Sequence, residues 1–148
     1  MTAPPPRPRV VEVAFWIILT SAVLLIIGGL MASAADFDDA RSAVASSVTD
    51  EDLRQYLTLY RGAGLISVLV GGALAFVAGR ARRGDARFYR ATVGLALAAV
   101  LVVGVFAVVL GVAQLVTLAA LLPLLIGVLV IVQPAARSWF AVKPEEVP

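Results

Sequence analysis

Forty-six consecutive residues without a charged side chain, 91–136, constrain this chain more than any other feature of its sequence. As one helix they would measure about 69 Å, roughly twice the thickness of the hydrocarbon core of a membrane. The stretch must therefore cross a membrane, turn and cross again. We expect the turn at 111–114, where Gly111 frees the backbone and Gln114 is polar. This predicts two spans, 91–110 and 115–132.

Two other uncharged stretches, 13–31 and 62–79, are also long enough to cross. The composition agrees, because 61% of the residues are hydrophobic and 15% are charged, against about half and a quarter in soluble domains. The sequence therefore predicts an all-α membrane protein. Its single integral membrane domain, 1–148, would be a four-transmembrane-helix bundle.

The Lys and Arg residues indicate the orientation, because short connections rich in them stay in the cytoplasm. With the N-terminus inside, the inner segments carry nine basic and four acidic side chains, a net charge of +5. The outer segment then carries three basic and six acidic side chains, a net charge of −3. We expect an N-in/C-in protein with an external loop 35–60 and an internal loop 80–90.

An alternative stays open for the first span. The small residues 32–35 resemble the cleavage site of a secretory signal, and cleavage after Ala34 would leave three spans. The uncharged run 13–31 is longer than the apolar core of a signal peptide. We therefore favour an uncleaved membrane anchor.

The external loop ends in an amphipathic pattern. Thr49, with Asp52 three residues later, resembles a capping box and predicts a helix start. We expect one helix over about 50–79, so that the second span has an amphipathic external extension. This face is a candidate contact for a partner's external domain, or it covers the chain's own 36–48. Its side chains are Leu53, Tyr56, Leu57 and Tyr60.

The second span carries a small residue at every fourth position. Small side chains let two membrane helices approach closely, so this face is a candidate helix seam. We expect the seam to lie within the bundle, with contact between two copies in a homo-oligomer as the alternative. The residues are Ser67, Gly71, Ala75 and Gly79.

Arginine dominates the internal loop. Basic side chains at this position attract anionic lipid headgroups by about 1 kcal/mol each, and membrane lipids are therefore predicted partners. Lipid contact and orientation account for the charge, so no nucleic-acid partner is predicted. The five candidates are Arg80, Arg82, Arg83, Arg87 and Arg90.

The residues that most enzymes need are missing. Histidine and cysteine are absent, which removes the commonest general base, thiol nucleophiles and the usual ligands of haem, iron–sulfur clusters and structural zinc. The acidic motif DFDD at 36–39, expected to lack regular structure, would hold a hard cation weakly at best. We expect no catalytic activity, no cofactor and no metal, and we expect Glu12 to pair with an inner arginine.

The chain opens with a proline-rich leader at 4–8, followed by Ala14-Phe15-Trp16. With the four-span plan and the arginine-rich inner loop, it resembles small uncharacterised integral membrane proteins of actinobacteria. The resemblance implies a location in the bacterial plasma membrane and assigns no functional residue.

Together these features predict a non-catalytic accessory or assembly subunit of a larger membrane complex, with other membrane proteins as partners. The alternative is a small homo-oligomeric transporter or lipid-handling protein. Pro123, which lies within the fourth predicted span, and the glycines favour that alternative. Reconstituted flux that depends on Gln114 or Pro123 would distinguish it.

Overall fold

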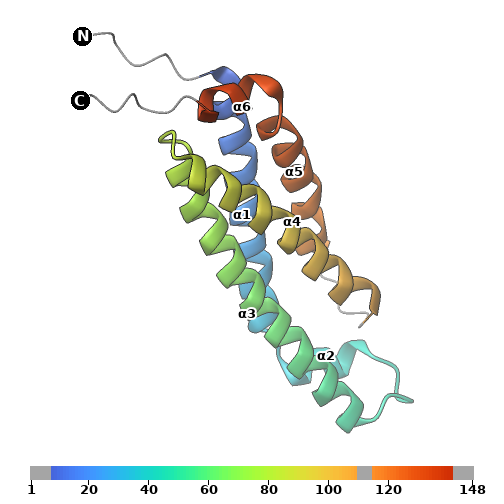
Figure 1. The fold of residues 1–148 in the computed structure, drawn as a ribbon. Coiled ribbons are helices and arrows are strands. Elements are labelled where there is room, and N and C mark those ends of the chain that lie inside the picture. Colours follow the sequence, from blue (N-terminus) through green and yellow to red (C-terminus); the bar gives the residue numbers. More distant parts are fainter. Residues whose placement is uncertain (1–7, 110–114, 142–148) are drawn as a thin grey trace, which may run out of the picture.

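The computed structural model describes residues 8–109 and 115–141, and these residues form six helices and no strands (Figure 1). The prediction of an all-helical chain is thus confirmed. Three helices, α1, α3 and α4, are long and apolar enough to cross a membrane, and the bent pair α5 and α6 adds a fourth if it counts as one span. The helices are α1 (Arg9–Ser33), α2 (Phe37–Ala43), α3 (Asp50–Ala81), α4 (Ala86–Val109), α5 (Leu115–Ile131) and α6 (Pro134–Ala141).

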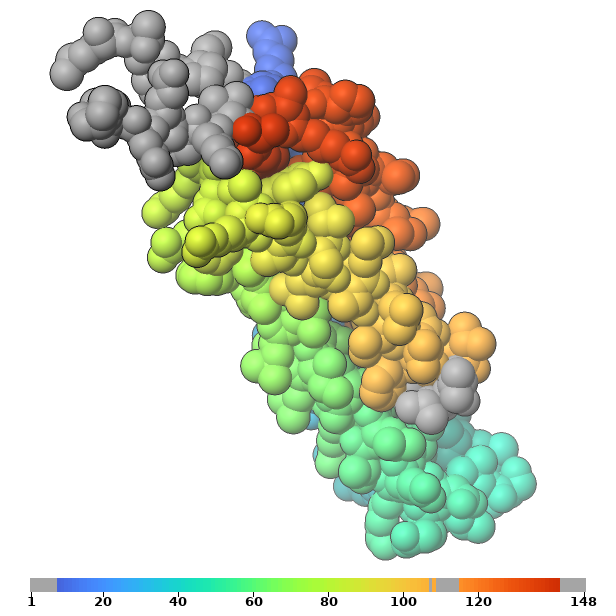
Figure 2. All heavy atoms as spheres, viewed as in Figure 1, coloured from blue at the N-terminus to red at the C-terminus, as the bar shows by residue number. Residues whose placement is uncertain are grey.

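Helix α1 is the centre of the bundle, with α3 packed on one side and α5 on the other. Its buried side chains run along its whole length, from Val11 through Ile18 and Leu25 to Ala32. Helix α4 packs on α3 and α5. Figure 2 shows α3 and α4 side by side, with α1 largely hidden behind them.

The contact between α1 and α3 depends on small residues spaced seven apart. Gly64, Gly71 and Ala78 are all buried on α3. A Cβ atom on Gly71 would lie 2.8 Å from the carbonyl oxygen of Ala22 on α1. The two backbones therefore touch, as small residues allow in membrane helices.

Hydroxyl groups inside the bundle bond to their own helices. Ser21 and Thr92 are completely buried, and each hydroxyl donates to the carbonyl four residues earlier, at 2.9 Å and 2.8 Å. This is the usual way in which a helix satisfies a buried hydroxyl.

Helix α3 begins where the sequence predicts. The Thr49 hydroxyl oxygen accepts a hydrogen bond from the Asp52 backbone N–H at 3.1 Å, so the predicted cap is confirmed. The helix then continues without interruption to Ala81.

The DFDD motif forms regular structure, contrary to the expectation from its composition. Asp36 caps α2, because its carboxylate accepts from the Asp38 N–H at 2.8 Å. Acidic Asp38 and Asp39 lie in the first turn and Arg41 in the last, which suits the helix dipole.

At the opposite end from α2, α6 turns away from α5 by 61° (Figure 1). Phe140 is buried, and its ring stacks on Tyr89 of α4 at 4.5 Å. The α3–α4 connection passes Gly84, whose φ of 94° favours glycine. The predicted turn at 111–114, with Gln114, lies outside the described residues, and Pro123 lies inside α5.

Candidate functional site

The structure projects one compact unit beyond the ends of α4 and α5 (Figure 1). We call it the outer unit, because the sequence predicts that it lies outside, and define it as residues 35–61: α2, the connection to α3 and the first turns of α3. It contains the four residues that the sequence predicts to contact a partner.

Three arginines hold the outer unit together. Arg61 donates from Nε and Nη2 to the carbonyl oxygen of Ala35, at 2.9 Å and 2.6 Å. Arg41 donates to the carbonyl oxygen of Val48 at 2.7 Å, and its Nε lies 3.3 Å from an Asp50 carboxylate oxygen.

The third arginine, Arg54, lies over the ring of Phe37 at 5.4 Å. This contact joins α3 to α2. All three outer arginines therefore contact groups of the outer unit itself, a role that their use in the charge count did not reveal.

The predicted partner-contact face is divided by the fold. Leu53 and Leu57 are 4% and 5% exposed, on the part of the chain where α2 packs on α3. Tyr56 is 40% exposed, and its ring stacks on the half-buried Tyr60 with centroids 5.8 Å apart. The two leucines serve packing, and the tyrosine pair, Tyr56 and Tyr60, remains available as a contact surface.

The four predicted seam residues also occupy different environments. Ser67 and Gly71 are buried, and Ala75 is half-buried. A Cβ atom on Gly79 would meet no atom within 4 Å. Gly64 and Ala78, which the four-residue spacing left out, are buried instead.

At the other end of the bundle, Arg82 links α3 to α1. Its Nη2 lies 2.5 Å from the Glu12 carboxylate, which confirms the predicted pairing of Glu12 with an inner arginine. The guanidinium also lies over the rings of Phe15 and Trp16, at 4.7 Å and 5.7 Å. Its Nε is buried without a hydrogen-bond partner, so stacking compensates in part for lost hydration.

The other predicted lipid-binding arginines make fewer contacts within the protein than Arg82 does. Arg80 lies over Phe76 and Phe88, at 5.5 Å and 5.8 Å. Arg83, Arg87 and Arg90 are exposed around the α3–α4 connection. These three have free access to a headgroup, and their binding of anionic lipid stays a prediction.

Among the described residues, no group of three or more acidic side chains is arranged to hold a metal ion. Asp36, in the motif considered for a cation, instead caps α2.

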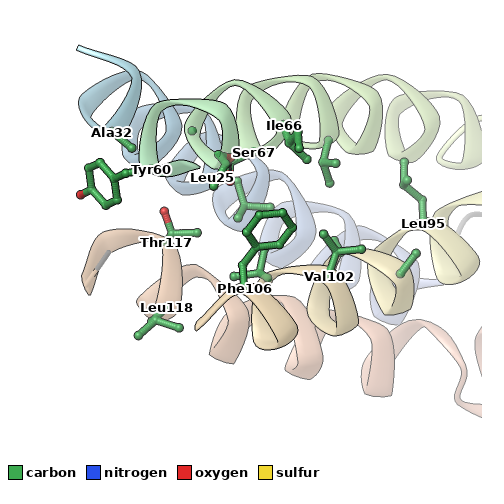
Figure 3. Close-up of a pocket in the computed structure, with 16 residues that line it drawn as sticks. Leu25, Ala32, Tyr60, Ile66, Ser67, Leu95, Val102, Phe106, Thr117 and Leu118 are labelled. Atoms are coloured by element: carbon green, nitrogen blue, oxygen red, sulfur yellow. Dashed lines mark hydrogen bonds between the residues drawn. The ribbon is translucent and has the colours of Figure 1, made fainter. Parts of the chain in front are cut away.

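A cavity of about 130 Å³ lies between α3 and α4, with its inner walls on α1 and α5 (Figure 3). Leu25 lines it from α1, Val102 and Phe106 from α4, and Leu118 from α5. The lining is almost entirely hydrocarbon. No signal in the sequence points to this cavity, because it arises from the divergence of two helices.

Comparison with protein-family models, with curated proteins and with solved structures finds no match to this chain.

Proposed function

We propose that this protein is a non-catalytic, multi-pass component of the bacterial plasma membrane that serves as an accessory or assembly subunit of a larger membrane complex. In this proposal both termini face the cytoplasm and the outer unit stands outside. The observation that carries it is the exposed ring of Tyr56, which is stacked on the half-buried Tyr60 in a unit that the chain itself braces.

Tyrosine is one of the residues that contribute most to protein–protein interfaces, because it buries a large ring and keeps a hydroxyl for hydrogen bonding. Tyr56 is 40% exposed and is held by its stack on Tyr60. A surface that is already ordered loses little conformational entropy when a partner binds. The bracing by Arg41, Arg54 and Arg61 therefore favours a docking role for the outer unit.

The side chains around the α3–α4 connection would hold this end of the bundle at the cytoplasmic surface of the membrane. Arg83, Arg87 and Arg90 are exposed next to the aromatic side chains of Phe88 and Tyr89. Basic and aromatic side chains together suit the cytoplasmic headgroup region of an anionic bilayer.

The test is affinity purification from the native membrane in a mild detergent, followed by mass spectrometry. We expect the wild-type protein to retain a stoichiometric heterologous partner and Tyr56→Ala to lose most of it. Gln55→Ala is the matched control, because Gln55 is the adjacent exposed residue on the same helix.

Equal retention by Tyr56→Ala and Gln55→Ala would overturn docking through the tyrosine pair. Recovery of the wild-type protein without any heterologous partner would overturn the accessory role. Recovery as a homo-oligomer would then favour the transporter or lipid-handling alternative.

A further inference from the structure

We infer that the cavity between α3 and α4 binds a segment of one acyl chain of a membrane lipid. Tyr60 of the tyrosine pair lines one end of this cavity. The inference rests on the apolar lining and does not depend on the proposed docking function.

The cavity exists because α4 leaves α3 on its way across the bundle. Near the inner end the two helices are close, with the rings of Phe76 and Phe88 6.2 Å apart. Farther along, α4 crosses toward α5 and the gap is lined by side chains from four helices (Figures 1 and 3). Leu25 of α1 faces this space between the diverging helices.

The chemistry of the lining excludes water. Ser67 is one of the few polar residues there, and its hydroxyl donates to the carbonyl oxygen of Ala63 at 3.0 Å within its own helix. A buried water needs two to four polar partners, and apolar cavities of about 150 Å³ in proteins stay dry and accept apolar molecules. A cavity of about 130 Å³ with this lining therefore suits a hydrocarbon ligand.

The cavity is also open to the surface that surrounds the helices. Ile66 lines it and is 42% exposed, and Ala98 lines it from α4 and is exposed as well. Both residues lie in helices long and apolar enough to cross a membrane. At that depth the surrounding molecules are lipid tails, so an acyl chain reaches the opening from the side.

The driving force is packing. Side chains around an empty cavity lack van der Waals partners, and a hydrocarbon chain restores those contacts. A cavity of about 130 Å³ accepts a segment of an acyl chain, whereas a helix of a second protein, about 10 Å across, is too wide for it.

The experiment places a tryptophan reporter in the cavity of the full-length protein. Trp16 and Trp139, the only two tryptophans, are replaced by Phe, and Phe106→Trp supplies the reporter. The matched control is Leu101→Trp on the same helix, since Leu101 is 66% exposed and does not line the cavity. Phosphatidylcholine with brominated acyl chains, which quench tryptophan on contact, is then titrated into each protein in detergent.

We expect the reporter at 106 to be quenched at a several-fold lower lipid-to-protein ratio than the reporter at 101, with saturation near one lipid per protein. Ala98→Phe, which narrows the opening, should remove this early phase. Coincident titrations at 106 and 101 would overturn the inference, as would a reporter at 106 that no lipid quenches. The comparison of these two reporters stands even if Ala98→Phe fails to fold.

Discussion

A Cβ atom on Gly29 would lie 2.5 Å from the carbonyl oxygen of Gly64, and a Cβ atom on Gly64 would lie 2.6 Å from the carbonyl oxygen of Gly29. The relation is reciprocal, and both contacts are with backbone atoms that cannot move aside. Helices α1 and α3 therefore cross at a point where only glycine fits on either side. The same surface continues at Gly71, where the obstacle is the backbone of Ala22.

Two adjacent glycines on α3 should differ in how well they tolerate leucine. Gly71→Leu places a side chain against the Ala22 backbone and should lower the free energy of unfolding by about 1–3 kcal/mol, the usual cost of overpacking. Gly72→Leu should cost nothing, because its Cβ meets no atom within 4 Å. Unfolding midpoints in detergent measure both, and equal losses would contradict the α1–α3 seam.

Arg82 should contribute more to stability than its neighbour Arg83. Arg82→Ala removes the contact with Glu12 and the stacking on Phe15, and we expect a loss of about 1–2 kcal/mol. Arg82→Lys should lose less stability than Arg82→Ala but still some, since it keeps the charge and loses the planar stack. Arg83→Ala serves as the exposed control, and thermal unfolding that ranks it equal to Arg82→Ala would refute this role.

The orientation can be measured directly, because the chain contains no cysteine. Ser47→Cys lies in the outer unit and Ser138→Cys lies on α6, and both positions are exposed. On intact cells a membrane-impermeant maleimide should label the first variant, and the second should react only after permeabilisation. Labelling of both on intact cells would mean three crossings, and the reverse pattern would mean the opposite orientation.

The first helix should remain in the protein that accumulates in the membrane. Helix α1 packs on both α3 and α5, so cleavage after Ala34 would remove the centre of the bundle. Intact-mass spectrometry of a C-terminally tagged protein should show residues 1–34 still attached. A mass that corresponds to a chain starting at Ala35 would contradict this expectation.

The start of α3 could be predicted because its signal is local. The Thr49 cap and the apolar residues that follow it are adjacent in the sequence, and α3 begins at Asp50 as expected. The pairing of Glu12 was also predictable, since the segments predicted to lie inside offer few acidic side chains and many arginines. Arg61, by contrast, bonds a backbone carbonyl at Ala35, and a carbonyl has no signature in a sequence.

The exact seam on α3 was not predictable from a spacing of four. Each such step overshoots a full helical turn by about 40°, so Ser67 and Gly79 end up on different sides of the helix. Steps that alternate between three and four residues stay on one side, which is why Gly64, Gly71 and Ala78 all face inward. A search for seven-residue periods would have found them.

The short helix α6 was missed for a related reason. No helix is predicted from the sequence after the span 115–132. Pro134 at the first helical position, with Ala136 and Phe140 four residues apart and both buried, is the local signal for that helix.

Helix α1 is synthesised first, although it packs on helices that are synthesised later. The helix made first has two faces to cover, yet α3 begins 17 residues after α1 ends and α5 is the last long helix made. Until α5 arrives, Gly127 and its neighbours are not there to meet Ile18, and that side of α1 faces lipid or the insertion machinery. A chain that ends before α5 would therefore leave the α5-facing side of α1 uncovered, although α3 already covers the other side.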